Sequence, residues 1–339
     1  MKRATMTAPG QIQIDETVAP TPGPGQVLLR IQRIGVCGSD IHVFHGKHPY
    51  TSYPVVQGHE FSALVAAVGP GVQGIEVGNK VTAMPQIVCG KCGPCLRGDE
   101  HICDALRVQG FQAPGCAQEL WVTAADKIVK LPDHFSFEQG ALVEPISVAV
   151  HAIQRAGKLA GRRAVVLGAG PIGNLVGQAA RAAGARVLIT DLSEHRLEIA
   201  RRCGLSETSN PAREELKEAS QRVFGAEGFD LAFECVGVEA TLDAAVSNLA
   251  KGGTLIVVGV FGDKPRVDLG LVQDRELRIS GTLMYQRPDY EQAVAWIASG
   301  DIVTEPLMSE HFAFSDYLQA YHHIEHKRDQ TMKVFIDVA

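Results

Sequence analysis

Short β-branched runs dominate roughly the first 145 residues, and turn-forming Gly and Pro residues separate them. The runs are Gln26–Ile34, Phe61–Val68, Lys80–Met84 and Glu119–Val122. Short strands with frequent turns are typical of an antiparallel barrel. The pattern therefore predicts a β-barrel domain in the first part of the chain.

After about residue 147 the pattern changes to short apolar strands that alternate with helices. The expected strands are Arg163–Leu167, Ala185–Thr190, Phe229–Glu234, Thr254–Val260 and Glu276–Ser280, and the expected helices are Pro171–Ala183, Glu194–Cys203 and Ala240–Leu249. Such alternation predicts βαβ units and a parallel sheet, so the chain is expected to be an α/β protein. From about Asp289 the pattern loosens, with a helix over Tyr290–Ala298 and a strand over Lys333–Val338.

Length and charge narrow the class of protein. A chain of 339 residues is longer than a domain with a single hydrophobic core typically is, so two domains are expected. The net charge is −6 and the Lys and Arg residues are scattered, which gives no electrostatic footprint for nucleic acid or an anionic membrane. No apolar run approaches the roughly 18 residues of a membrane span, and the first residues lack the apolar segment of a secretory signal. We expect a soluble cytoplasmic protein with reduced thiols.

Four cysteines form a Cys-x2-Cys-x2-Cys-x7-Cys pattern, made by Cys89, Cys92, Cys95 and Cys103. Zinc at a structural site prefers four thiolates in a tetrahedron, and closely spaced ligands let one loop surround the ion. Disulfides are disfavoured because these spacings are too tight to pair well, and the remaining alternative is cysteines that are close by chance. The pattern predicts a structural zinc site, which performs no chemistry itself.

A second motif, Gly168-Ala169-Gly170-Pro171-Ile172-Gly173, lies between an expected strand and an expected helix. In a dinucleotide site the three glycines permit the tight turn, the approach to the pyrophosphate and the close packing of helix on strand. Asp191 ends the next strand, where its carboxylate can accept hydrogen bonds from the ribose hydroxyls of NAD and repel the extra phosphate of NADP. Arg196 either contacts the adenosine or is a solvated helix residue. The motif predicts NAD binding.

Sulfur, nitrogen and oxygen donors occur in three further segments: Cys37-Gly38-Ser39-Asp40-Ile41-His42, Gly58-His59-Glu60 and Glu144-Pro145. A catalytic zinc uses about three protein ligands and leaves one position for water or substrate. Each residue alone also fits a structural role, and the argument depends on their combination.

That combination resembles the zinc-dependent medium-chain dehydrogenase/reductase family over essentially the whole chain. The resemblance implies a GroES-like β-barrel catalytic domain over 1–146, with the four-cysteine lobe at about 86–106. It implies a Rossmann domain with a doubly wound parallel sheet over 147–285, and a C-terminal return to the catalytic domain over 286–339. Within the family the chain looks most like the sorbitol (L-iditol) or polyol dehydrogenase branch, because Glu144-Pro145 replaces a ligand cysteine of the alcohol dehydrogenases.

The resemblance also implies roles for single residues. Cys37 and His59 look like direct ligands of the catalytic zinc, and either Glu60 or Glu144 looks like the third. Asp40 falls where the family keeps a carboxylate on the ligand histidine, and Ser39 where it keeps the hydroxyl that takes the substrate proton.

His42 falls at the outer end of the proton relay, although a structural histidine is the alternative. The family would bind two zinc ions and one NAD per subunit, and it suggests a homodimer or homotetramer.

The expected reaction is reversible hydride transfer from a secondary alcohol of a polyol or vicinal diol to NAD, giving the ketone. One departure concerns Met284, which aligns with an arginine of the polyol enzymes and leaves room for shorter, less polar diols. The alternatives are the same chemistry on a sugar acid of the gulonate or galactonate type or on L-threonine. A more remote alternative is an NAD-binding protein that has no catalytic activity.

Overall fold

The computed structural model describes residues 1–339 and divides them into two compact units. Unit 1 contains Met1–Glu144, Gln286–Val294 and Met308–Ala339, and unit 2 contains Pro145–Tyr285 and Ala295–Leu307. The units share α3 (Phe137–Arg155) and α9 (Arg287–Ser299), each of which begins in unit 1 and ends in unit 2.

Within the C-terminal part, Gln286–Val294 and Met308–Ala339 belong to unit 1, whereas Ala295–Leu307 belongs to unit 2. The segment Ala295–Leu307 packs with unit 2. The amide of Gln178 donates to the carbonyl of Val303 at 3.1 Å and accepts from its N–H at 2.7 Å, and Arg181 donates to the carbonyl of Asp301 at 2.9 Å. These hydrogen bonds to its backbone attach the segment to the α/β unit.

Unit 1 is built on a seven-stranded sheet that is antiparallel except for one parallel pair. The strand order is β16-β17-β3-β4-β5-β9, and β8 also pairs with β3. Their bounds are β3 Gln26–Gly35, β4 Glu60–Val68, β5 Lys80–Ala83, β8 Leu120–Ala124, β9 Ile128–Lys130, β16 Met308–Ala313 and β17 Lys333–Asp337. Two-stranded ladders are formed by β1 (Lys2–Ala8) with β2 (Gln11–Glu16) and by β6 (Gln86–Ile87) with β7 (Arg107–Val108). The predicted barrel-like strand region is confirmed.

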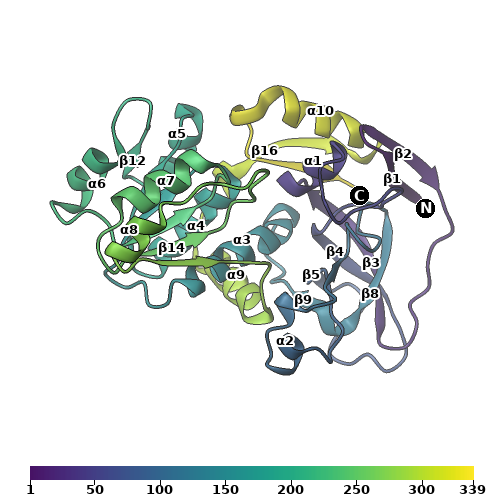
Figure 1. Cartoon of the computed structure of the whole chain (residues 1–339). Helices are drawn as coiled ribbons and strands as arrows, with labels where there is room; N and C mark the ends of the chain where they lie inside the picture. The colour runs from purple at the N-terminus through teal and green to yellow at the C-terminus, as the bar shows by residue number, and fades with distance from the viewer. The chain divides into compact units, whose positions relative to one another are not determined.

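Few helices accompany this sheet. Besides α3, unit 1 holds α1 (Gly38–Phe44), α2 (Gly93–Leu96) and α10 (Tyr317–Lys327), and in Figure 1 α10 lies along β16. Short 3-10 turns occur in unit 1 at Glu100–Ile102, Ala125–Lys127, Phe314–Asp316 and Arg328–Gln330, and in unit 2 at Glu305–Leu307. The core includes Phe61 and Trp121, whose rings meet edge to face at 5.2 Å between centroids.

Unit 2 contains a six-stranded sheet that is parallel throughout, in the order β12-β11-β10-β13-β14-β15. This is the strand order 3-2-1-4-5-6 of the doubly wound nucleotide-binding fold. The bounds are β10 Arg163–Leu167, β11 Arg186–Thr190, β12 Thr208–Ser209, β13 Leu231–Glu234, β14 Thr254–Val257 and β15 Arg278–Gly281. Because β14 is paired on both sides, the edge strand on that side is β15.

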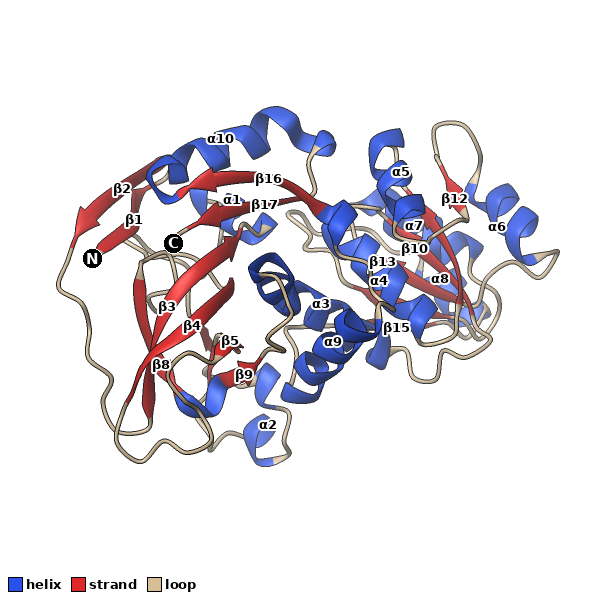
Figure 2. Cartoon of the chain, turned by 180° about the vertical axis from the view of Figure 1, so that it is seen from behind, coloured by secondary structure: helices blue, strands red, loops and turns tan.

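Helices connect these strands (Figure 2). They are α4 (Pro171–Ala182), α5 (Glu194–Arg202), α6 (Leu216–Phe224), α7 (Glu239–Asn248) and α8 (Leu269–Asp274). One face of the sheet packs Val165 and Leu255 against apolar residues of α6, α7 and α8, among them Phe224 and Leu242. No helix of either unit has the length and apolar character needed to cross a membrane.

Candidate metal and dinucleotide sites

Cys37 stands at the N-cap of α1, which directly follows β3. Its N–H donates to Asp40 Oδ2 at 3.0 Å, so the carboxylate at the third helical position fixes the backbone of the cap. The Ser39 hydroxyl donates to the Cys37 sulfur at 3.1 Å. One short helix start therefore presents the thiol, the hydroxyl and the carboxylate that the sequence singles out.

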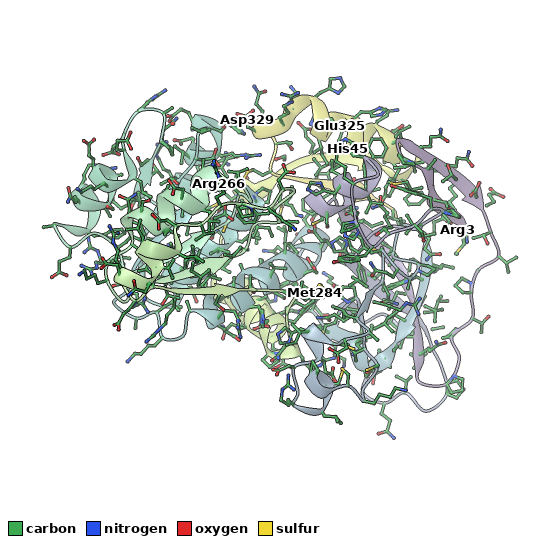
Figure 3. All side chains as sticks on the ribbon, in the orientation of Figure 1. Arg3, His45, Arg266, Met284, Glu325 and Asp329 are labelled. Carbon is green, nitrogen blue, oxygen red and sulfur yellow. The ribbon has the colours of Figure 1, made fainter.

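A side-chain contact joins α1 to α10, in the C-terminal part of unit 1. His45, at the C-cap of α1, forms an ion pair with Glu325 of α10 when its ring is protonated, and Figure 3 labels both side chains. His42, in the last turn of α1, is exposed. Its exposure is compatible with the predicted outer end of a proton relay.

His59 and Glu60 enter the site where β4 begins. Gly58 precedes them with φ +90°, and a Cβ at this position would lie 2.8 Å from the Cys116 sulfur. Only glycine fits such a left-handed position without strain. The ring of His59 is 6% exposed and packs against Phe111, at 4.9 Å between ring centroids.

Glu60 is fully buried and lies opposite Gly35 in the antiparallel ladder of β3 and β4. Its carboxylate forms an ion pair with Lys333 of β17, which is 3% exposed. The Lys333 ammonium also donates to the carbonyl of Val36 at 3.4 Å. A buried carboxylate is thus compensated by a buried cation, as burial of charge requires.

The donor atoms of Cys37, His59 and Glu60 all lie within 4.8 Å of one another. One sulfur, one imidazole nitrogen and one carboxylate oxygen at this spacing match the ligand types of a three-ligand zinc site with an open position. Glu144, which is 5% exposed on α3, does not belong to this closest set. Its charge still raises the pKa values of His59 and Lys333.

Electrostatics in this set also fit a metal. Burial raises the pKa of Asp40, although the neighbouring His59 lowers it in part. Burial alone would lower the pKa of His59, but Asp40 and Cys37 raise it well above its usual value. Burial likewise opposes the charge of Lys333, yet Glu60 and Cys37 raise its pKa. The anionic surroundings of His59 favour a cation, and zinc would replace its proton because only neutral imidazole binds metal.

Residues around Asp40 were not singled out by the sequence. Gln57 donates to Asp40 Oδ1 at 3.2 Å, and the Tyr321 hydroxyl donates to Gln57 Oε1 at 3.0 Å. The same Asp40 oxygen lies 3.6 Å from His59 Nδ1. A chain of buried polar groups from α10 therefore orients the carboxylate toward the histidine, as in metal sites whose ligand histidine is held by a carboxylate.

The four-cysteine lobe forms a second donor set. The Cys92 sulfur lies 3.4 Å from that of Cys95 and 3.8 Å from that of Cys103. Zinc–sulfur bonds of about 2.3 Å in a tetrahedron separate the sulfurs by about 3.8 Å. All four cysteines are free of disulfides, and all four sulfurs lie within 4.8 Å of one another.

Their ionisation indicates the same ion. Backbone N–H groups of Lys91 and Cys92 lower the pKa of Cys89 to about 6, whereas partial burial and the neighbouring sulfurs raise the pKa of Cys95 to about 12. Four thiolates at this spacing repel one another, so full ionisation needs a cation such as zinc.

In unit 2 the glycine motif forms the turn between β10 and α4. Gly168 has φ +98°, and a Cβ on Gly173 would lie 1.9 Å from the Gly168 carbonyl oxygen. Pro171 and Ile172 begin α4 directly after Gly170. The turn and helix start therefore have the close backbone packing that a pyrophosphate site needs.

Asp191 follows β11 and lies beside this turn. Its Oδ2 accepts from the Ala169 N–H at 2.7 Å and its Oδ1 from the Ser193 N–H at 2.8 Å. Arg196 approaches Asp191 Oδ2 at 3.9 Å, and its guanidinium lies 3.7 Å from the ideal Cβ position of Gly170. Arg196 thus lies over the glycine turn.

Two family models match this chain. One described as an alcohol dehydrogenase GroES-like domain matches residues 23–133, and one described as a zinc-binding dehydrogenase matches residues 171–299.

Single relatives extend this likeness over most of the chain. A 2-dehydro-3-deoxy-L-galactonate 5-dehydrogenase of Pseudoalteromonas atlantica is 35% identical over 93% of this chain and 92% of its own. Sorbitol dehydrogenase 2 of Saccharomyces cerevisiae is 34% identical over 92% and 91%. The crystal structure of 2R,3R-butanediol dehydrogenase from Bacillus subtilis has a TM-score of 0.91 at 27% identity, covering 100% and 99%.

The chain belongs to the zinc-binding dehydrogenases with a GroES-like domain. It is an NAD(P)-dependent zinc dehydrogenase that acts on CH–OH groups. The four-cysteine set is its structural zinc site, and Cys37, His59 and Glu60 form its catalytic zinc site.

Proposed function

We propose that the protein oxidises a secondary alcohol of a polyol or vicinal diol to the ketone, with NAD as acceptor and in a reversible reaction. The observation that carries this proposal is the convergence of Cys37, His59 and Glu60 within 4.8 Å, with the Ser39 hydroxyl on the sulfur of Cys37. A bound zinc ion supplies a Lewis acid for the alcohol oxygen, and NAD supplies the hydride acceptor.

The chain's own residues hold the metal and move the proton. Cys37, His59 and Glu60 hold the metal, and Asp40 orients the His59 ring. Ser39 Oγ would accept the alcohol proton as it gives up its own hydroxyl proton, and the exposed His42 would pass that proton to solvent.

Glu144 would contribute negative charge from α3, directly or through a water molecule. Lys333, which pairs with Glu60, would hold the Glu60 carboxylate beside the metal.

NAD is proposed as the preferred cofactor. Its pyrophosphate would lie on the turn that the glycine motif forms, made by Gly168, Gly170, Pro171, Ile172 and Gly173. Pro171 has no N–H, so the donors would come from the other residues of the turn. Asp191 would accept hydrogen bonds from the adenosine ribose, and Arg196 would contact the adenosine next to it.

The polyol or diol class is supported by two observations, and a third separates the diols from the polyols. Glu144-Pro145 is the pair seen in the polyol branch, and sorbitol and butanediol dehydrogenases are among the relatives. Met284 supplies no charge. Arg287 donates to the backbone carbonyls of Asp126 and Ile128, so it is engaged elsewhere and does not replace the arginine of the polyol enzymes. An apolar residue in place of that arginine favours short vicinal diols over long polyols.

A sugar acid is the second candidate. The relative that oxidises 2-dehydro-3-deoxy-L-galactonate is 35% identical over nearly the whole chain. The segment 41–59, which leads from α1 to the catalytic histidine, carries Lys47 and four histidines and no carboxylate: His42, His45, His48 and His59. Such a segment suits an anionic substrate better than an acidic one would.

The test is NADH formation by zinc-replete protein with matched panels of long polyols, short vicinal diols, sugar acids and L-threonine. Preference for the diols or polyols supports the proposal. Preference for sugar acids or L-threonine would change the assigned substrate but leave the assigned reaction type unchanged. Cys37→Ser serves as the control and is expected to lose activity while the fold persists. Absence of turnover in zinc-loaded, NAD-bound protein would contradict the proposal.

We also propose a homodimer or homotetramer, as the family resemblance suggests. The exposed edge strand β15, whose Ile279 is 41% exposed, supports a contact between copies there. Analytical ultracentrifugation of the zinc-loaded protein tests this, since a monomer at micromolar concentration would contradict it.

A further inference from the structure

The carboxyl ends of β11 and β12 bring two loops together beside the predicted ribose position. Thr190 pairs with Ser209 in the parallel ladder, and the Asp191 N–H donates to the Ser209 carbonyl at 3.2 Å. Asp191 and Asn210 therefore leave their strands side by side. In this fold the residue that ends the second strand meets the adenosine ribose, so what surrounds Asp191 faces the 2′ position.

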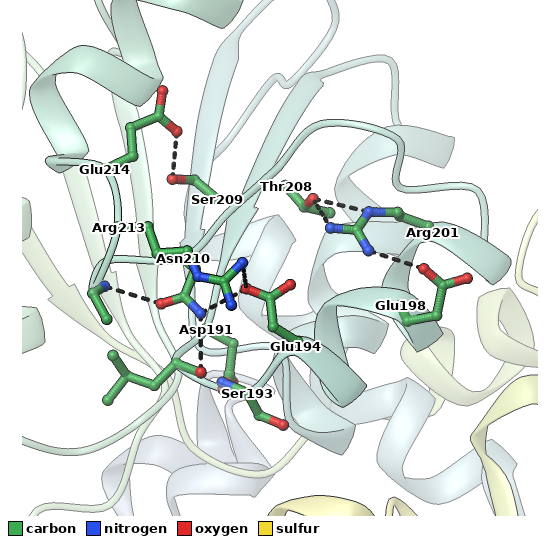
Figure 4. Close-up of polar contacts among 12 residues, drawn as sticks. Asp191, Ser193, Glu194, Glu198, Arg201, Thr208, Ser209, Asn210, Arg213 and Glu214 are labelled. Carbon is green, nitrogen blue, oxygen red and sulfur yellow. Dashed lines mark hydrogen bonds and ion pairs between the residues drawn. The ribbon is translucent and has the colours of Figure 1, made fainter.

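Asn210 links the two loops through its side-chain amide (Figure 4). Its Nδ2 donates to the Leu192 carbonyl at 3.1 Å and to Glu194 Oε1 at 2.8 Å, and its Oδ1 accepts from the Ala212 N–H at 2.9 Å. Arg213, in the same loop, places Nη1 3.2 Å from the same Glu194 oxygen. Glu194 is thus held by one amide and one guanidinium next to the turn that follows Asp191.

Charges in this region are paired one to one. Asp191 faces Arg196 at 3.9 Å, and Glu194 faces Arg213 at 3.2 Å. The 2′-phosphate of NADP would add between one and two negative charges here, since its second pKa is near 6. Both arginines already have a carboxylate partner, so neither is free to neutralise that phosphate.

We propose that Glu194 is a second specificity-determining residue for the cofactor, because its ion pair withholds Arg213 from the 2′-phosphate of NADP. The inference rests on the proposed use of NAD. Arg213 is the stronger candidate for such recruitment, since its side chain is 71% exposed whereas that of Arg196 is 27% exposed and lies over the glycine turn. Selection against NADP then depends on two carboxylates, Asp191 and Glu194.

Fluorescence titration of the zinc-loaded full chain with NADH and with NADPH tests the proposal through binding alone. Glu194→Gln keeps the acceptor for Asn210 but removes the charge that holds Arg213. We expect NADPH to bind about fivefold more tightly and NADH to bind as before, the size of one exposed contact between arginine and phosphate. Low ionic strength should enlarge the difference.

Two further variants make the result specific. Glu198→Gln is the matched control, because Glu198 lies on the same helix and pairs with Arg201 at 2.9 Å without contacting the Asp191 turn. It should change neither affinity. The double variant Glu194→Gln/Arg213→Gln should lose the gain for NADPH.

Three outcomes would overturn the inference. They are unchanged NADPH affinity in Glu194→Gln, an equal gain in Glu198→Gln, or a gain that survives loss of Arg213. If the wild type binds NADH and only the shift is missing, the proposed function stands and this inference falls. If the wild type binds neither dinucleotide, both fall.

Discussion

Gly35 and Glu60 lie directly opposite one another in the ladder of β3 and β4, and a Cβ on Gly35 would lie 2.5 Å from Glu60 Oε2. The same ideal Cβ would lie 3.3 Å from the Cβ of Glu60. The carboxylate cannot simply turn away, because Lys333 holds it and the residue is fully buried. The absence of a side chain at position 35 therefore makes room for a catalytic zinc ligand.

Gly35→Ala should displace the Glu60 carboxylate and weaken the catalytic zinc without affecting the structural one. We expect the purified variant to retain about one zinc per chain after mild chelation, where the wild type retains two. Metal analysis after dialysis against a chelator measures this. Gly262→Ala is the control, since a Cβ there has nothing within 4 Å. Equal zinc retention in both variants and the wild type would contradict the assigned role of Gly35.

Lys333→Met should destabilise the metal-free protein, because it leaves the buried Glu60 carboxylate without its cation. Loss of one partner of a buried ion pair costs about 3–5 kcal/mol. Zinc should restore much of this, since the metal supplies the missing positive charge and no longer lies near an ammonium group. We expect zinc to raise the melting temperature more in Lys333→Met than in the wild type, as differential scanning fluorimetry with and without zinc would measure. An equal increase would show that Lys333 does not influence the metal.

Cys92→Ser should remove the structural zinc and lower stability while leaving the chemistry of the catalytic site intact. A closed zinc site contributes directly to folding, so the melting temperature should fall and zinc content should drop by one per chain. Below the new melting temperature the kcat should stay within about a factor of two of the wild type. A loss of rate at an unchanged melting temperature would contradict the structural assignment of this lobe.

Local sequence signals predicted the parts of the site that lie close together in the chain. The glycine turn and Asp191 follow consecutive strands, and Cys37, Ser39 and Asp40 lie at the start of one helix. Their spacing in the sequence was therefore enough to predict that they lie together. Lys333 was not predicted as a site residue. It comes near Glu60 only because β17 pairs with β3, which places Phe335 opposite Gly35. A single lysine in an apolar strand gives no signal for such a distant partner.

The longest helix that the sequence analysis did not predict is α3, which carries Glu144. It was missed because its helical sequence pattern is interrupted. Gly140 and Pro145 break the helical signal. Gly140 is needed for packing, since a Cβ would lie 2.7 Å from Leu131 Cδ1 and 2.8 Å from Ser62 Cβ. Strand β14 was predicted to run to Val260 and ends at Val257, because the N–H groups of Val258 and Gly259 turn to bind the Glu234 carbonyl. Tertiary contacts therefore determine both the helix α3 and the end of strand β14.

The last prediction concerns acid stability and the ion pair of Arg33 with Glu138. Arg33 Nε donates to Glu138 Oε1 at 2.6 Å and lies 3.2 Å from Asp337 Oδ1. Burial alone would raise the pKa of Glu138, but the hydrogen bond from Arg33 and one from its own backbone N–H outweigh it and lower the pKa. A lowered folded pKa means that the ionised carboxylate stabilises the folded state above the unfolded pKa of about 4.3.

Glu138→Gln should therefore lower stability at pH 7 by about 1 kcal/mol, or roughly 2–4 °C in melting temperature. As the pH falls through the folded pKa of Glu138, the wild type loses this contribution and the two melting temperatures should converge. Glu16→Gln, an exposed position on β2, is the control and should match the wild type throughout. Melting curves between pH 7 and pH 3 measure the difference. A gap that stays constant or widens toward low pH would mean that packing of the side chain, and not its charge, stabilises the fold.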